Sequence, residues 1–129
     1  KFGKIHLDHA DFCSGWFKNK HIIQHRFDQA FYASTSILRL TVSYRGCKIS
    51  GEEHVNAVLT DLYDMVVNTD YSIKPLTISQ LDPKYLDHHF NESDADSVCF
   101  SYGTMQTYII LISQTNSTKL TNNSYITVF

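Results

Sequence analysis

The chain has 129 residues, 43% of them apolar and 19% charged, with a net charge of -2 at neutral pH. This composition is typical of one folded domain and excludes a disordered chain, so we expect residues 1–129 to form a single compact domain. The near balance of charges argues against a dedicated nucleic-acid-binding protein. No apolar run approaches the roughly 18 residues that a membrane-spanning helix needs, so we expect no membrane span.

The beginning of the chain and its sequons favour a secreted protein. The first residue is Lys1 and not Met, and we therefore expect the chain to be processed or excised from a longer polypeptide. Three Asn-x-Ser/Thr sequons begin at Asn91, Asn116 and Asn122, all in polar, turn-like stretches. Secreted proteins carry N-linked glycans in such stretches, and we predict a secreted location.

The three cysteines are Cys13, Cys47 and Cys99. An odd number permits at most one disulfide within the chain and leaves one thiol over. Cys13 and Cys47 could form that bridge. Cys99 stands in an alternating strand pattern, and we expect it to be a buried thiol.

The first third of the chain predicts one clear strand. Residues 4–7 suggest a short strand, residues 8–26 have mixed periodicity and are predicted as a loop, and a helical turn is expected within residues 21–31. Residues 36–44 alternate apolar and polar side chains, which is typical of a half-buried antiparallel strand. A turn at Arg45-Gly46 then leads to a short strand at residues 47–49.

The strongest prediction is a helix over residues 51–68. Ser50 and Glu53 have the spacing of a capping box, in which each side chain pairs with a backbone N–H of the first turn. The apolar residues that follow recur at steps of three and four and form one stripe, namely Val55, Val58, Leu59, Leu62, Met65 and Val66.

The second half of the chain is predicted as strands and turns with one short helix. An extended segment follows residue 70, and Pro75 favours an edge strand over a central one. Asp82-Pro83 predicts a helix over residues 83–90, followed by a loop at residues 91–96. Residues 97–113 are predicted as a hairpin with a two-residue turn at Gly103-Thr104, and residues 125–129 as a last strand.

These elements together predict an α+β fold dominated by β-structure. Six to seven short strands, most of them joined by hairpins, would form an antiparallel sandwich or open barrel with one long helix packed across it. We find no strand–helix alternation in this prediction, and therefore do not expect a parallel sheet.

Residues 6–13, HLDHADFC, form the densest group of metal-ligand side chains in the chain. His6, Asp8, His9 and Asp11 could supply the three or four N and O ligands that zinc takes. The H-x-D-H portion resembles part of the H-x-H-x-D-H motif of metallo-β-lactamase-type hydrolases, with Lys4 in place of the first histidine. That resemblance implies a metal-bound water as nucleophile, with His9 and Asp11 in catalytic roles.

A second resemblance involves the same stretch. Asp87-His88-His89, downstream of the first acidic motif, resembles the DHH-type phosphoesterases, with Phe12 where that family has a glycine after the aspartate. Both resemblances are partial and imply a metal-dependent hydrolase with zinc or manganese. We keep this as the alternative hypothesis. The principal prediction is a protein with no cofactor and no enzymatic activity.

The aromatic and basic segment at residues 16–21 is the predicted contact surface. Residues 1–26 hold five basic and two acidic side chains, so they carry +3 and the remainder of the chain carries -5. Aromatic residues beside cations anchor many protein interfaces. We predict a small, effector-like module that binds a host or partner protein, either through an exposed strand edge or through Trp16, Phe17, Lys18, Lys20 and His21.

Overall fold

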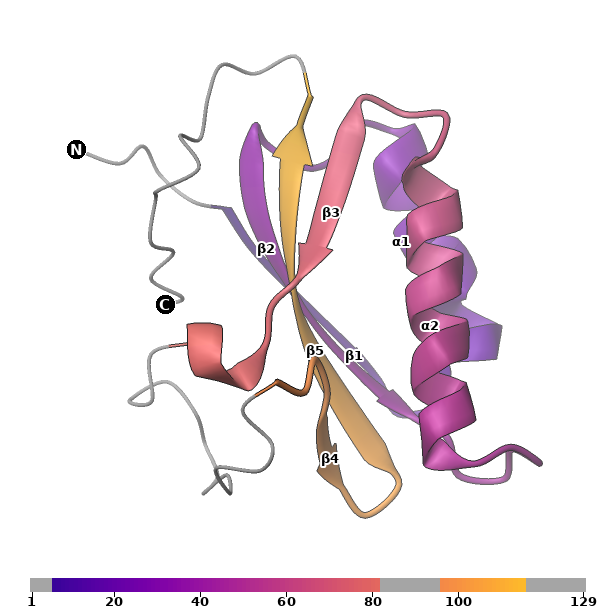
Figure 1. Ribbon diagram of the computed structural model, residues 1–129. Helices are drawn as coiled ribbons and strands as arrows, with labels where there is room; N and C mark the ends of the chain where they lie inside the picture. The colour runs from indigo at the N-terminus through magenta and orange to yellow at the C-terminus, as the bar shows by residue number, and fades with distance from the viewer. Residues whose placement is uncertain (1–5, 82–95, 116–129) are drawn as a thin grey trace.

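The computed structural model of the protein describes residues 6–81 and 96–115. In this part of the chain, one mixed β-sheet carries two α-helices on one of its faces (Figure 1). The elements in chain order are β1 (His6–Phe12), α1 (Trp16–Asp28), β2 (Thr35–Ser43), α2 (Gly51–Val66), β3 (Tyr71–Pro75), a short 3-10 helix (Ile78–Gln80), β4 (Phe100–Tyr102) and β5 (Met105–Gln114).

The sheet has the strand order β1-β2-β5-β3, and β4 pairs with β5 beside that path. β1 and β2 are parallel, whereas β5 is antiparallel to both β2 and β3. β1, α1 and β2 therefore form a β-α-β unit, and α2 carries the chain from β2 across β5 to the far edge. The helices cover one face because both crossovers return on the same side of the sheet (Figure 1).

The α+β class is confirmed, but several details of the predicted fold differ. The described residues form one sheet of five strands with two helices, where we predicted six to seven strands with one long helix. The pairing of β1 with β2 is parallel, because α1 supplies a crossover that the predicted loop could not. The predicted helix at 83–90 and strand at 125–129 lie outside the described residues.

The predicted capping box is present at the start of α2. The backbone N–H of Glu53 donates to Ser50 Oγ at 3.1 Å, and the backbone N–H of Ser50 donates to Glu53 Oε1 at 3.2 Å. The helix ends at Val66, two residues before the predicted end. Two further predictions are confirmed: β3 with Pro75 is an edge strand, and β4 and β5 form a hairpin around Gly103-Thr104.

The largest correction falls on residues 8–26. The predicted loop comprises most of β1 followed by most of α1. Residues 47–49, predicted as a strand, form bends instead, because Gly46, at a φ of 82°, turns the chain away from β2.

The main core lies between the sheet and the two helices. Leu38, Leu40 and Val42 of β2 point toward the helices and have no more than traces of exposed surface. The helices meet them with buried apolar and aromatic side chains, which are Trp16, Ile23, Phe27, Val58 and Leu62. A second, smaller core covers the other face of the sheet, where Leu76 and Leu81 pack with Ile37, Ile109 and Leu111.

No helix among the described residues is both long enough and apolar enough to cross a membrane.

Candidate functional site

The predicted contact segment, residues 16–21, is the first part of α1, and its side chains separate into two groups. Trp16 is completely buried, and its Nε1 donates to Asp61 Oδ2 of α2 at 2.8 Å. Lys20 Nζ lies 3.3 Å from the same carboxylate oxygen. The indole of Trp16 therefore joins the two helices, and Trp16 is no part of an exposed surface in this structure.

The other group lies on the outer side of α1. Phe17, Lys18 and His21 are exposed, and the first turn of the helix contains no acidic residue. The ring of Phe17 is 46% exposed, and its other side rests at 90° against the ring of His54, with 5.6 Å between the ring centroids. The outer side of α1 thus presents one aromatic ring together with the Lys18 ammonium group and the His21 imidazole.

His54 is a buried histidine in the first turns of α2, held by a polar network. Its Nδ1 lies 2.6 Å from Gln106 Oε1 of β5, and the Tyr108 hydroxyl donates to the same oxygen at 3.0 Å. The amide nitrogen of Gln106 donates to the carbonyl oxygen of Gly51 at 2.9 Å. His54 has no exposed surface, and its Nε2 has no hydrogen-bond partner among the described residues.

The four metal-ligand candidates of β1 point to two sides of the sheet. Successive side chains of a strand alternate between its faces, so His6 and Asp8 lie on the helix side, and His9 and Asp11 lie on the other. Asp8 is already paired: Arg26 Nη1 is 2.5 Å from Asp8 Oδ2, and the Tyr32 hydroxyl donates to that oxygen at 2.8 Å.

No group of three or more His, Cys, Asp or Glu residues in the described segments is arranged to hold a metal ion. The geometry therefore gives the alternative hydrolase no metal centre at residues 6–13. The Asp87-His88-His89 stretch and the three sequons lie outside the described residues. Within those segments, the three cysteines are free thiols, and Cys99 is buried as predicted.

Burial changes the acidity of three groups in the core. Burial and the adjacent Asp8 carboxylate raise the pKa of Tyr32 well above its ordinary value. Burial likewise raises the pKa of Cys99, and burial with the neighbouring Cys99 raises that of Tyr108. These shifts mark tightly packed interior groups, because removing water disfavours the charged form.

Comparison of the chain with protein-family models, with curated proteins and with solved structures finds no significant match.

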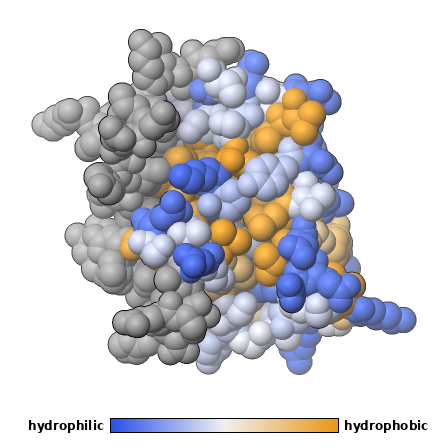
Figure 2. Space-filling view, viewed as in Figure 1, coloured by the Kyte–Doolittle hydropathy of each residue, from blue (hydrophilic) through white to orange (hydrophobic). Residues whose placement is uncertain are grey.

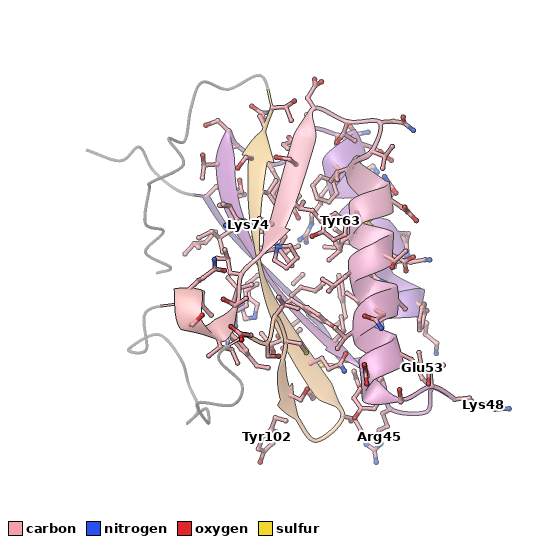
Figure 3. All side chains as sticks on the ribbon, in the orientation of Figure 1. Arg45, Lys48, Glu53, Tyr63, Lys74 and Tyr102 are labelled. Carbon is pink, nitrogen blue, oxygen red and sulfur yellow. The ribbon has the colours of Figure 1, made fainter. Side chains whose placement is uncertain are left out.

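A second exposed apolar surface lies where α2 passes the sheet edge at β3. We call this the β3–α2 flank and define it by Val55, Leu59, Tyr63, Val67 and Ile73. Leu59 and Ile73 are partly buried against the main core, whereas Tyr63 is 48% and Val67 70% exposed. Figure 2 shows apolar surface between α2 and the sheet on this side, and Figure 3 shows Tyr63 on the side of α2 that faces β3.

β3 itself adds a backbone edge to this flank. Among the described strands, β3 pairs with β5 alone, so no described strand pairs with its second edge. Lys74 of β3 is exposed and lies on the side of the strand away from α2 (Figure 3). An apolar strip beside an open strand edge is an arrangement that can receive an extended peptide.

Sequence reasoning missed both His54 and the β3–α2 flank. His54 precedes Val58 by four residues and Leu62 by eight, so it falls on the apolar stripe of α2, and that position was a readable signal of burial. Tyr63 and Val67 fall just off the stripe, four residues apart. Their position beside β3 depends on the crossover of α2, which no local pattern records.

Proposed function

We propose that this protein is a non-enzymatic module that binds an extended segment of a partner protein along β3 and the β3–α2 flank. The observation that carries the proposal is the juxtaposition of an edge strand with exposed Tyr63 and Val67. Backbone pairing along the edge would supply affinity, and alternate apolar side chains of the partner would lie on the flank. Pro75 lacks an N–H, and the N–H of Tyr71 donates to Thr69 Oγ1. We therefore expect pairing to use the N–H of Ile73 and the outward-facing carbonyl oxygens of Tyr71 and Ile73.

The apolar exposure of the flank supports a partner rather than a merely solvated surface. Isolated exposed apolar residues are ordinary, but a contiguous apolar surface in a protein frequently marks an interaction site. Tyr63 is suited to anchor such an interface, since Tyr is enriched among the residues that dominate binding energy. The partner segment we expect is extended, with apolar residues at alternate positions.

A second candidate surface is the outer side of α1, formed by Phe17, Lys18 and His21. It is favoured by its exposed Phe17 ring, by the exposed Lys18 and by the lack of acidic residues in the first turn. This surface would take a partner carrying acidic groups, with Phe17 as the apolar anchor. Lys20 contributes less to it, because its ammonium group is paired with Asp61.

Single substitutions separate the two surfaces. We expect Tyr63→Ala to weaken partner binding by roughly 30-fold, the loss of about 2 kcal/mol that is typical of an interface anchor. Phe17→Ala tests the α1 surface. Phe31→Ala is the matched control, since Phe31 has the same residue type and nearly the same exposure, 48% against 46% for Phe17, and contacts neither Phe17 nor the flank in the described interactions.

The assay is quantitative affinity capture with wild type and the three variants, followed by calorimetry with each purified partner. We expect the Phe17→Ala and Phe31→Ala variants to capture the same partners as wild type. The Tyr63→Ala variant should lose these partners. Loss of the partners with Phe17→Ala alone would place the binding site on α1. Equal binding by all three variants would refute both surfaces, and self-association that Tyr63→Ala abolishes would identify a second copy of the chain as the occupant.

We further propose that the protein is secreted and acts on a host or partner protein as a small effector-like molecule. The three sequons at Asn91, Asn116 and Asn122 support this proposal. Expression through a eukaryotic secretory pathway should give a protein whose mass falls on treatment with an N-glycosidase. A mass that does not change would remove the sequons as support.

A further inference from the structure

The two faces of β3 differ in the side chains that they would offer to a strand added at its open edge. Successive side chains of a strand alternate between the faces of a sheet. Tyr71 is buried and Ile73 partly buried in the main core, on the helix face, so Ser72 and Lys74 lie on the outer face. An added strand continues this alternation. Its side chains would lie in turn on the β3–α2 flank and beside Ser72 and Lys74.

Lys74 is the charged side chain of β3 on the outer face. It is exposed, and its cross-strand neighbour on β5 is the apolar Leu111. Neither of the two ion pairs found in the described residues includes it. A carboxylate beside Lys74 on an added strand would form a cross-strand pair of opposite charge, and such pairs stabilise a sheet.

The helix face of the same edge has the opposite character. α2 borders the β3–α2 flank and contains no Lys or Arg, and its acidic residues are Glu52, Glu53, Asp61 and Asp64. A partner carboxylate on this face would leave water for an apolar surface beside an acidic helix, which is unfavourable. Acidic residues of an added strand are therefore favoured on the outer face, and apolar residues on the helix face.

The open edge of β3 is poorly suited to the same edge of a second copy of the chain. Ile73 supplies the one N–H of β3 that points away from β5 and is free to donate. Tyr71 donates its N–H to Thr69 Oγ1, and Pro75 has none. Two copies of β3 could thus exchange at most two hydrogen bonds, and each would bring a Lys74 and no carboxylate to the outer face. A segment of a different protein is the better occupant.

We propose, building on the proposed function, that the segment bound at β3 belongs to a different protein and has apolar residues on the helix face and an acidic residue, Asp or Glu, beside Lys74 on the outer face. This pattern also fixes the register of the segment. A shift by one residue would place the carboxylate on the β3–α2 flank and the apolar side chains on the outer face.

The test compares two synthetic peptides in NMR titrations that follow the backbone amide of Ile73 at physiological salt. The acidic peptide is acetyl-Thr-Val-Glu-Val-Glu-Val-Thr-amide, and the basic peptide has Lys in place of both Glu. We expect wild type to bind the acidic peptide about fivefold more tightly, because an attractive cross-strand pair replaces a repulsive one. The net charge of the protein is -2, so overall charge would favour the basic peptide, and the expected preference reports a local contact.

Three variants locate that contact. Lys74→Glu should reverse the preference, so that the basic peptide binds about fivefold more tightly, and Lys74→Ala should abolish it. Lys48→Glu is the matched control, since it changes the net charge equally and Lys48 is exposed and lies well away from Lys74 (Figure 3). It should keep the preference of wild type. The amide spectrum of each variant reports whether it is folded.

The outcomes separate the acidic partner from the proposed function. If both peptides bind wild type equally and Tyr63→Ala weakens both, the β3–α2 flank is the binding site but its partner needs no acidic residue, and the inference is overturned. A preference for the acidic peptide that persists in Lys74→Glu would overturn it as well. If neither peptide binds, the β3 edge does not receive an extended segment of this pattern, and the proposed function fails with the inference.

Discussion

The sequence suggested that Trp16 binds a partner, whereas the structure shows that Trp16 contributes to stability. The substitution Trp16→Phe keeps an aromatic ring but removes the indole N–H that donates to Asp61 Oδ2 at 2.8 Å. The lost hydrogen bond contributes about 1 kcal/mol, since the side chain of Asp61 is 25% exposed and partly solvated. The smaller ring in a fully buried site removes roughly 1–2 kcal/mol more.

We therefore expect Trp16→Phe to lower the free energy of unfolding by about 2–3 kcal/mol, a large part of the roughly 5–15 kcal/mol that a domain has in total. Urea denaturation followed by circular dichroism measures it. In wild type the single tryptophan should fluoresce at short wavelength and resist quenching by acrylamide. A change in stability below about 0.5 kcal/mol, or a readily quenched indole, would refute the reasoning and return Trp16 to the surface.

Two further predictions concern the core and the start of α2. Tyr32, Cys99 and Tyr108 have raised pKa values in the folded state, so they stay protonated while the unfolded chain ionises. The contribution of each group to stability is complete below its ordinary pKa, about 9 for Cys99 and about 10 for the two tyrosines. Above that pKa, stability falls by about 1.4 kcal/mol per pH unit for each group. Tyr108→Phe should make this decline shallower in urea denaturation at pH 8 to 11, and an unchanged slope would contradict the assignment. Ser50→Ala should lower the free energy of unfolding by about 1 kcal/mol through loss of the cap, and unchanged thermal stability would show that the cap contributes nothing.

The parts of the fold that the sequence predicted are those whose signals are local. α2 has a side-chain cap and an apolar stripe, and both are complete within its own residues. β2 alternates apolar and polar residues from Leu38 to Ser43, although most of its side chains are buried, and the β4–β5 hairpin has Gly103, at a φ of 60°, in its turn. Pro75 similarly identified an edge strand from its missing N–H alone.

Only the second half of α1 was predicted, through the helical turn expected within residues 21–31, because the local signals of this helix are weak. It has 13 residues, of which only Trp16, Ile23 and Phe27 are buried. Its N-cap is Gly15, which provides no side-chain hydrogen bond to the first turn. Most of its stability must come from packing on α2 and the sheet, which is common for short helices and which the sequence alone does not record.

β1 was only partly recognised for a related reason. It is an edge strand in which Ala10 is the one fully buried residue, so its polar sequence reads like a loop. The same polar residues suggested a metal site because they are close together in sequence. In a strand, however, the side chains of successive residues point to opposite faces. The pairing of Asp8 with Arg26, 18 residues away, is likewise visible only in the fold.

The most direct measurement of the central proposal is hydrogen–deuterium exchange of the protein alone and bound to a captured partner. If the partner adds a strand to the sheet, the backbone amide of Ile73, which the register turns away from β5, should exchange at least about tenfold more slowly in the complex, while the amides of α1 remain unchanged. Protection confined to α1, with β3 exchanging as in the free protein, would contradict binding along the β3 edge.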